Sequence, residues 1–278
     1  MKKIVFIILT AAAMSACTEK IDIELDSTYD RLAVEGYVTT EKGTNWVRLI
    51  HSTDYYSGSE PAAVSDASVQ MSDGFTTFEL NEDAQNPGFY LPDEDFKGVA
   101  GRTYTIDINL QENIGGFKSY SASCVLNPVA PIDSIRVEYN DDWEVYEVQI
   151  FALEPATIDF YRFDVLKNGE LLTDTINKVW ISDDRFFNGN YTMGSMVGIL
   201  DPDDPREKPE AGDTITLRMG NITKEYYNFI LQLQDQTFQY RNPLFSGPPA
   251  NVLTNFENAL GFFAAYSVTY SSTIYNGD

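Results

Sequence analysis

The stretch ASVQMSDGFTTFEL, residues 67–80, decides the fold class of this chain. It consists of a run that suits a strand, an Asp73-Gly74 pair and a second run that suits a strand. An Asp-Gly pair between two such runs is a strong signal for a tight hairpin turn. The stretch therefore predicts two neighbouring antiparallel strands.

Similar short runs continue on both sides of this hairpin. RLAVEGYVTT (31–40) places Leu32, Val34 and Val38 on one face, RTYTIDINL (102–110) alternates cleanly, and FKSYSASCVL (117–126) follows a Gly115-Gly116 turn. Strands about every ten residues, separated by turn residues and without a helix, indicate an antiparallel β-sandwich. We expect this N-terminal sandwich to span residues 31–128.

A second β-rich series follows the proline-containing stretch NPVAPIDS, residues 127–134. It contains a further hairpin signal, Lys167-Asn168-Gly169-Glu170, and one helical pattern at about 223–240, which Thr223 can cap. We expect a C-terminal β-rich domain over 131–278. The predicted fold is mainly β, with two consecutive antiparallel β-sandwich domains of immunoglobulin-like or transthyretin-like type, the second carrying one inserted α-helix.

The N-terminus reads as an export signal. Lys2 and Lys3 precede an almost wholly apolar run over residues 4–13, which is too short to span a bilayer but suits a secretory signal peptide. The run ends in Met14-Ser15-Ala16-Cys17, which resembles a bacterial lipobox.

The lipobox resemblance implies that residues 1–16 are removed and that Cys17 receives fatty acyl chains such as palmitate. Two or more chains hold a protein firmly on a membrane, whereas one gives marginal binding. Residues 17–30 would form the lipidated terminus and a tether, and their acidic character resembles a signal for display on the outer face of the outer membrane. The alternative is a cleaved secreted protein with an incidental Cys17.

Charge and cysteine content exclude several classes of function. The chain carries 19 basic and 42 acidic residues, and loss of Lys2 and Lys3 would lower the net charge from −23 to −25. Such a charge argues against nucleic acid as a partner and against an electrostatic hold on anionic lipid. Once Cys17 is lipidated, Cys124 has no disulfide partner, and we expect it to be a buried thiol.

No catalytic residues are predicted. His51 is the only histidine and is more simply read as a strand end than as a general base, and no cofactor motif is present. Asp141, Asp142, Asp183 and Asp184 leave a glycosidase pair open, because sequence spacing does not show whether two carboxylates face one cleft. We predict no metal site, and the weak candidates for calcium are Asp201, Asp203 and Asp204.

Aromatic residues in polar loops are the candidate contacts for a ligand or partner. Such rings stack on sugars or anchor a protein, although they also pack under their own loops. The tryptophans at 46, 143 and 180 are expected chiefly in the core. The candidate contact residues are Tyr55, Tyr56, Phe186, Phe187 and Tyr191.

Several segments resemble the DUF4249 family of outer-membrane lipoproteins: RLAVEGYVTT, VRLIHSTDYYS, PAAVSDASVQMSDG, NPGFYLPDEDFKGVAGRTYTIDI, and a closing stretch that begins TKEYYNFILQLQDQ and ends NVLTNFENALGFFAAYS. The resemblance implies a lipid anchor in the outer membrane, exposure at the cell surface and a neighbouring TonB-dependent transporter. We therefore expect a non-enzymatic accessory to nutrient import, acting by capture of a glycan or peptide ligand or by docking to the transporter. The alternatives are a surface glycan or peptide hydrolase using loop carboxylates, and an architectural envelope protein.

Overall fold

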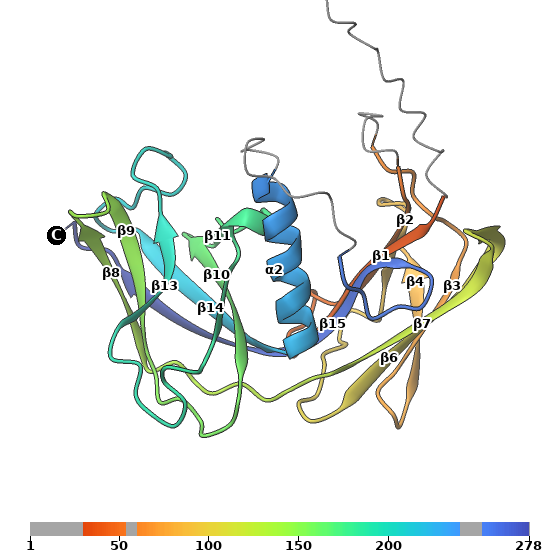
Figure 1. Cartoon of the computed structure of the whole chain (residues 1–278), viewed down its shortest axis with the longest axis horizontal. Coiled ribbons are helices and arrows are strands. Elements are labelled where there is room, and N and C mark those ends of the chain that lie inside the picture. Colours follow the sequence, from red (N-terminus) through yellow and green to blue (C-terminus); the bar gives the residue numbers. More distant parts are fainter. Residues whose placement is uncertain (1–29, 54–59, 240–251, 278) are drawn as a thin grey trace, which may run out of the picture.

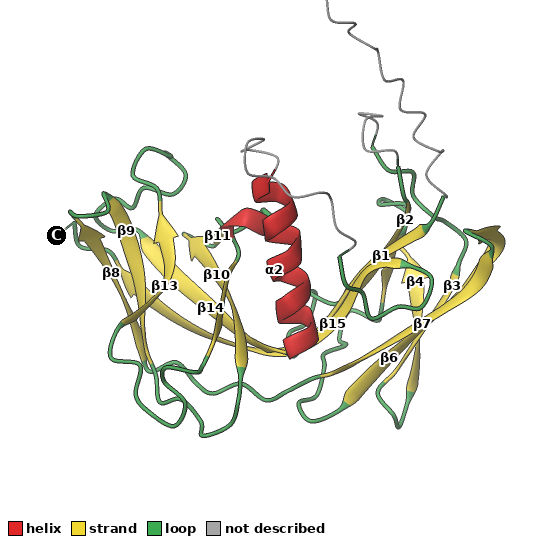
Figure 2. Ribbon diagram, viewed as in Figure 1, coloured by secondary structure: helices red, strands yellow, loops and turns green. Residues whose placement is uncertain are grey.

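The computed structural model describes residues 30–53, 60–239 and 252–277, and over these the chain is mainly β (Figures 1 and 2). No helix among these residues is long and apolar enough to cross a membrane. The elements, in chain order, are β1 (Leu32–Thr39), β2 (Trp46–His51), β3 (Ser68–Ser72), β4 (Thr77–Glu82), β5 (Phe89–Leu91), β6 (Thr103–Ile114), β7 (Phe117–Val125), β8 (Ser134–Asn140), β9 (Val145–Phe151), β10 (Phe160–Lys167), β11 (Glu170–Leu171), the 3₁₀ turn η1 (Ile176–Lys178), β12 (Trp180–Asp183), β13 (Ser195–Leu200), β14 (Thr214–Ile222), α2 (Lys224–Gln239) and β15 (Leu260–Ile274).

The hairpin predicted from residues 67–80 is confirmed as β3 and β4. The Asp73 carboxylate accepts hydrogen bonds from the backbone N–H groups of Phe75 and Thr76, and Gly74 adopts a positive φ of 86°. Such a conformation favours glycine, and an aspartate at this place satisfies backbone donors of the turn. Val69 on β3 and Leu80 on β4 are paired and both buried.

The strands of the described residues form one sheet of twelve strands and one of three. The path of the large sheet is β11-β10-β14-β15-β1-β2-β5-β4-β3-β6-β7, with β12 also paired to β10, and the small sheet is β13-β9-β8. The lobe built from β1 to β7 encloses the N-terminal core. This buried cluster contains residues between Leu32 and Leu126 together with Phe263 and Ala265 of β15. The C-terminal core lies between the small sheet and the β10–β14 part of the large one, so this lobe is a sandwich.

Strand β15 belongs to both lobes. Its first half, Leu260–Tyr266, pairs with β1 in parallel, and its second half, Ser267–Ile274, pairs with β14 antiparallel. The mainly-β, sandwich-like fold with one α-helix is thus confirmed, but the large sheet is mixed and not wholly antiparallel. The parallel pair joins segments that lie more than two hundred residues apart in the chain.

The predicted helix is confirmed as α2, which lies between the two lobes against one face of the large sheet (Figure 1). The hydroxyl of Thr223 accepts a hydrogen bond from the N–H of Tyr226 at 3.3 Å, as a capping residue does. Tyr226 and Ile230 are buried against Phe262 and Tyr266 of β15, and together they form a third, smaller core.

The start of β15 yields a test of how the two lobes are joined. Gly261 has a φ of 90°, and an added Cβ would lie 1.9 Å from the carbonyl oxygen of Val34 on β1. We expect Gly261→Ala to lower the free energy of unfolding by more than about 2 kcal/mol, because it adds a clash to backbone strain. Gly74→Ala is the matched control, with a φ of 86° and no atom within 4 Å of the added Cβ, and should cost about 1 kcal/mol. Equal losses in urea denaturation would contradict the close approach of β15 to β1.

Candidate functional site

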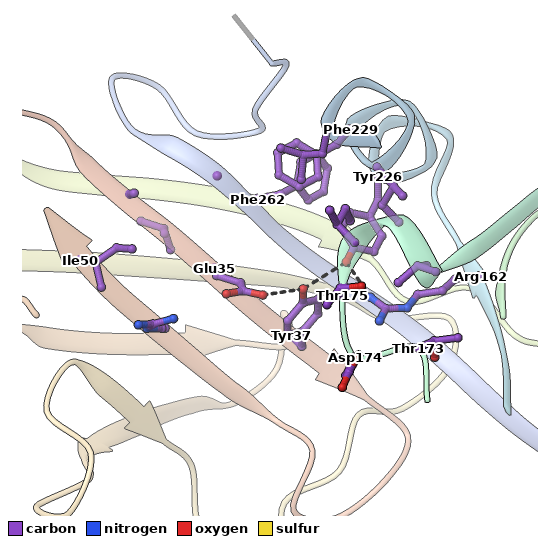
Figure 3. A pocket seen from close by; sticks show the side chains of 18 residues that line it. Glu35, Tyr37, Ile50, Arg162, Thr173, Asp174, Thr175, Tyr226, Phe229 and Phe262 are labelled. Atoms are coloured by element: carbon purple, nitrogen blue, oxygen red, sulfur yellow. Dashed lines mark hydrogen bonds between the residues drawn. The ribbon is translucent and has the colours of Figure 1, made fainter. Parts of the chain in front are cut away.

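A cleft of about 360 Å³ lies between α2 and the strands beneath it (Figure 3). We call it the helix cleft. Its walls come from α2, from β1 and β2 of one lobe, from β10 and residues 173–179 of the other, and from the start of β15. It is lined by Ala33, Val34, Glu35, Tyr37, Arg48, Ile50, Arg162, Thr173, Asp174, Thr175, Ile176, Val179, Tyr226, Phe229, Ile230, Leu233, Gly261 and Phe262.

A chain of hydrogen bonds crosses the cleft from one lobe to the other. Arg162 Nη1 donates to the Tyr226 hydroxyl at 3.1 Å, Tyr226 donates to Tyr37 at 3.3 Å, and Tyr37 donates to Glu35 Oε1 at 2.9 Å (Figure 3). Burial raises the pKa of both tyrosines, so both hydroxyls keep their protons at physiological pH. The chain therefore fixes two aromatic rings and one guanidinium in defined positions.

Arg162 is itself held by a buried carboxylate. Its Nε and Nη2 atoms lie 3.1 and 3.0 Å from Asp164 Oδ1, and the Asp164 side chain is only 3% exposed. Arg218 Nη1 lies 3.6 Å from the other Asp164 oxygen, and Arg218 Nε lies 3.5 Å from Glu41. Because a buried charge is costly unless it is paired, this network holds β10, β14 and the β1–β2 loop in one arrangement.

Aromatic rings form the apolar wall of the cleft. The ring centroid of Phe262 lies 5.1 Å from those of both Phe229 and Tyr226. Tyr266 stacks nearly parallel to Tyr226, with centroids 6.3 Å apart. Gly220 makes room for this stack, because a Cβ there would lie 2.8 Å from the Tyr266 ring. Packed rings of this kind give an apolar ligand a rigid surface.

Two side chains of opposite charge, Glu35 and Arg48, also line the cleft. They are cross-strand partners on β1 and β2, yet neither forms an ion pair with a residue in the described part of the chain. Glu35 accepts from Tyr37, and the Arg48 guanidinium lies over the Phe89 ring at 5.2 Å. The cleft therefore combines apolar rings, hydroxyl groups and charges of both signs, which suits binding of an amphipathic ligand.

The predicted contact residues that the structure describes lie outside the helix cleft. Phe186 is 82% exposed and Tyr191 is 38% exposed, both in the loop between β12 and β13. Phe187, in the same loop, is partly buried and borders a small pocket of about 60 Å³. Tyr55, Tyr56 and Cys17 fall outside the described residues.

The weak calcium candidates are in a turn that carries a counter-ion. Asp201 and Asp204 accept hydrogen bonds from backbone N–H groups of the same turn, those of Asp203 and Arg206. Lys178 lies 3.6 Å from Asp204 and closer still to Glu207. These acids are not among the carboxylates that the structure brings within coordinating distance of one another.

The other acidic and histidine candidates have separate surroundings. Asp183 forms an ion pair with Arg185, and Asp141 and Asp142 are exposed in the turn between β8 and β9. His51 Nδ1 lies 2.9 Å from an Asp30 oxygen at the exposed end of β2. These groups lie in different parts of the fold and do not line the helix cleft.

Expectations for the core hold for some residues and fail for others. Cys124 is buried, as expected, and burial raises the pKa of its thiol to about 11. Trp46 packs against the ring of Tyr37. Trp180 packs against the C-terminal core. The expectation for Trp143 was wrong, because this ring lies 62% exposed in the β8–β9 turn.

Sequence reasoning missed most of the helix cleft. The apolar stripe of α2 was visible in the sequence, but its partners come from β1, β2 and β10. The one available signal was the pair Arg162 and Asp164, charged residues at alternating positions in an otherwise apolar strand. Charged residues at alternating positions of a strand indicate either an exposed face or a buried ion pair. Only the structure shows that Arg162 and Asp164 form a buried ion pair.

A family model described as a domain of unknown function, DUF4249, matches residues 18–272, which is nearly the whole chain. No curated protein matches the chain significantly.

The hydrogen-bond chain across the cleft predicts a cost for removing one hydroxyl. Tyr226→Phe leaves the ring in place but deprives Arg162 of an acceptor and Tyr37 of a donor. We expect a loss of about 1–3 kcal/mol in the free energy of unfolding, measured by denaturation with guanidinium chloride. Tyr139→Phe, at an exposed ring in the β8–β9 hairpin, is the control and should change stability by less than about 0.5 kcal/mol. An unchanged free energy of unfolding in Tyr226→Phe would show that this chain of hydrogen bonds does not help to join the two lobes.

Proposed function

This chain belongs to the DUF4249 family, and we propose that it is a lipid-anchored, non-enzymatic binding protein of the outer membrane that serves a TonB-dependent importer. The sequence around Cys17 supports the anchor. The helix cleft supports capture of a ligand as the main task, with the exposed loop that carries Phe186 as a further contact for the transporter.

The observation that carries the proposal is the construction of the helix cleft. Arg162, Tyr226 and Tyr37 are fixed by a continuous hydrogen-bond chain before any ligand arrives. Groups that are already ordered lose little conformational entropy on binding, so such a site favours affinity. A purely architectural protein has no evident need for ordered polar groups lining a cleft.

The same lining favours binding over hydrolysis. In the described residues it contains no serine, cysteine or histidine that could act as a nucleophile or base. Its two carboxylates are Glu35, which accepts from Tyr37, and Asp174, whose Oδ2 lies 3.0 Å from Arg206. The loop acids considered for glycoside hydrolysis are not part of this lining.

The membrane anchor is tested by mass spectrometry of the native protein. We expect the N-terminal peptide of protein taken from membranes to begin at Cys17 and to carry acyl chains, and Cys17→Ala to release the protein into the soluble fraction. A TonB-dependent transporter should co-purify in fixed proportion with the lipidated form. An unmodified Cys17 thiol or a different N-terminus would contradict the anchor, and loss of co-purification alone would contradict the transporter.

Ligand capture is tested by fluorescence titration of the protein with defined short peptides and oligosaccharides. We expect at least one of these classes to bind, and Phe229→Ala to weaken its binding at least tenfold by removing part of the apolar wall, about 1.4 kcal/mol. Phe75→Ala, at an 84% exposed ring on the β3–β4 turn, is the matched control and should leave binding unchanged. Failure of both ligand classes to bind, or equal effects of the two variants, would contradict capture in the helix cleft.

A further inference from the structure

Two loops of the C-terminal lobe, residues 152–159 and 184–194, are joined side by side. The N–H of Glu154 donates to the Asn190 carbonyl at 2.9 Å, and the N–H of Thr192 donates to the Ala152 carbonyl at 3.0 Å. We call this pair the tip loops. The second loop follows β12, the first leads into β10, and neither contributes to the helix cleft.

Three carboxylates gather where the tip loops meet. Glu154, Asp159 and Asp184 each offer an oxygen, and these oxygens lie within 4.8 Å of one another. Glu154 is 7% exposed and Asp184 is 4% exposed. No basic side chain of residues 30–53, 60–239 or 252–277 forms an ion pair with any of the three. Three negative charges so close together, two of them buried, are unfavourable without a counter-ion.

Hydrogen bonds orient these carboxylates but leave oxygens available. Tyr161 donates to Glu154 Oε1 at 2.6 Å, and Asn188 donates to Asp184 Oδ2 at 3.1 Å. Among the described residues, no donor reaches Glu154 Oε2 or Asp184 Oδ1. A metal-binding carboxylate is commonly held in place by a hydrogen bond to one oxygen, while its other oxygen is left for the metal.

Asn221 on β14 supplies an independent observation. It is 4% exposed, and its Nδ2 donates to Asp159 Oδ1 at 2.8 Å and to the Pro128 carbonyl at 2.9 Å, so its amide group lies beside the cluster. Its Oδ1 is buried and has no hydrogen-bond partner within the described residues. A buried amide oxygen without a donor is costly, and amide oxygens are ordinary ligands of calcium.

We propose that Glu154, Asp159 and Asp184 bind a calcium ion that ties the tip loops together, with Asn221 Oδ1 as a further oxygen ligand. The donor set consists of oxygens alone, which suits a hard cation and not zinc or copper. Its members come from two loops and a strand, and such an irregular set fits the flexible coordination of calcium better than the strict octahedron of magnesium.

The tip loops carry three strongly exposed apolar side chains, Ile158, Phe186 and Met193. A calcium ion would hold these side chains in one arrangement, so their exposure would be stable.

The test is thermal unfolding of the full mature chain in calcium chloride, magnesium chloride or EDTA, together with terbium luminescence sensitised by Tyr161. We expect millimolar calcium to raise Tm by about 5 °C or more over EDTA, and magnesium to raise it less. Asp184→Asn should abolish the calcium-dependent shift and reduce the terbium signal at least tenfold. Asp201→Asn is the matched control, in the turn that holds the sequence-based candidates, and should keep both.

A calcium-independent Tm in the wild-type protein would overturn the proposal, and so would a shift of equal size in Asp184→Asn and the wild type. Loss of the shift in Asp201→Asn alone would place the ion in the other turn and would also overturn it. Far-UV circular dichroism in EDTA shows whether Asp184→Asn is folded. If it is not, Glu154→Gln is compared with Asp201→Asn in the same way.

Discussion

Strand β15 pairs in parallel with β1 over Leu260–Tyr266 and antiparallel with β14 over Ser267–Ile274, and this double pairing makes one sheet out of two lobes. Its side chains alternate between faces, so Phe263 enters the N-terminal core while Phe262 and Tyr266 face α2. The parallel segment closes a loop of over two hundred residues. Closing this loop costs entropy, and burial along both faces of β15 offsets that cost. Phe263 and its neighbours are almost fully buried.

The helix cleft is a consequence of that pairing. Because β1 and β14 flank the same strand, residues of the first lobe, such as Tyr37, come next to residues of the second, such as Arg162. Helix α2 covers this junction, and Tyr226 lies within reach of both. The cleft therefore has no counterpart in either lobe alone, and a change that loosened the junction would act on binding and on stability together.

Local features of the fold were predictable from the sequence, because their causes lie within a few residues of one another. The turn at Asp73-Gly74 and the start of α2 at Thr223 are of this kind. The pairing of β1 with β15 was not predictable, since alternation shows which face of a strand is buried but not which strand lies beside it. The carboxylate cluster was hidden for the same reason. Asp184 attracts notice in the sequence because it is adjacent to Asp183, but it meets Glu154 only through tertiary structure.

The two groups of buried acids in the C-terminal lobe show how charge distinguishes a structural network from a binding site. Asp164 lies against Arg162 and Arg218, so its charge is balanced inside the protein and the network can serve to hold strands in register. The cluster around Glu154 has hydroxyl and amide donors but no described cationic side chain. Neutral donors orient a carboxylate without cancelling its charge, and three such groups with oxygens within 4.8 Å of one another leave a negative centre that a small divalent ion would neutralise. The two groups therefore differ in net charge: arginines balance Asp164, whereas no described basic side chain balances the cluster around Glu154. The buried fraction of these acids alone does not reveal this difference.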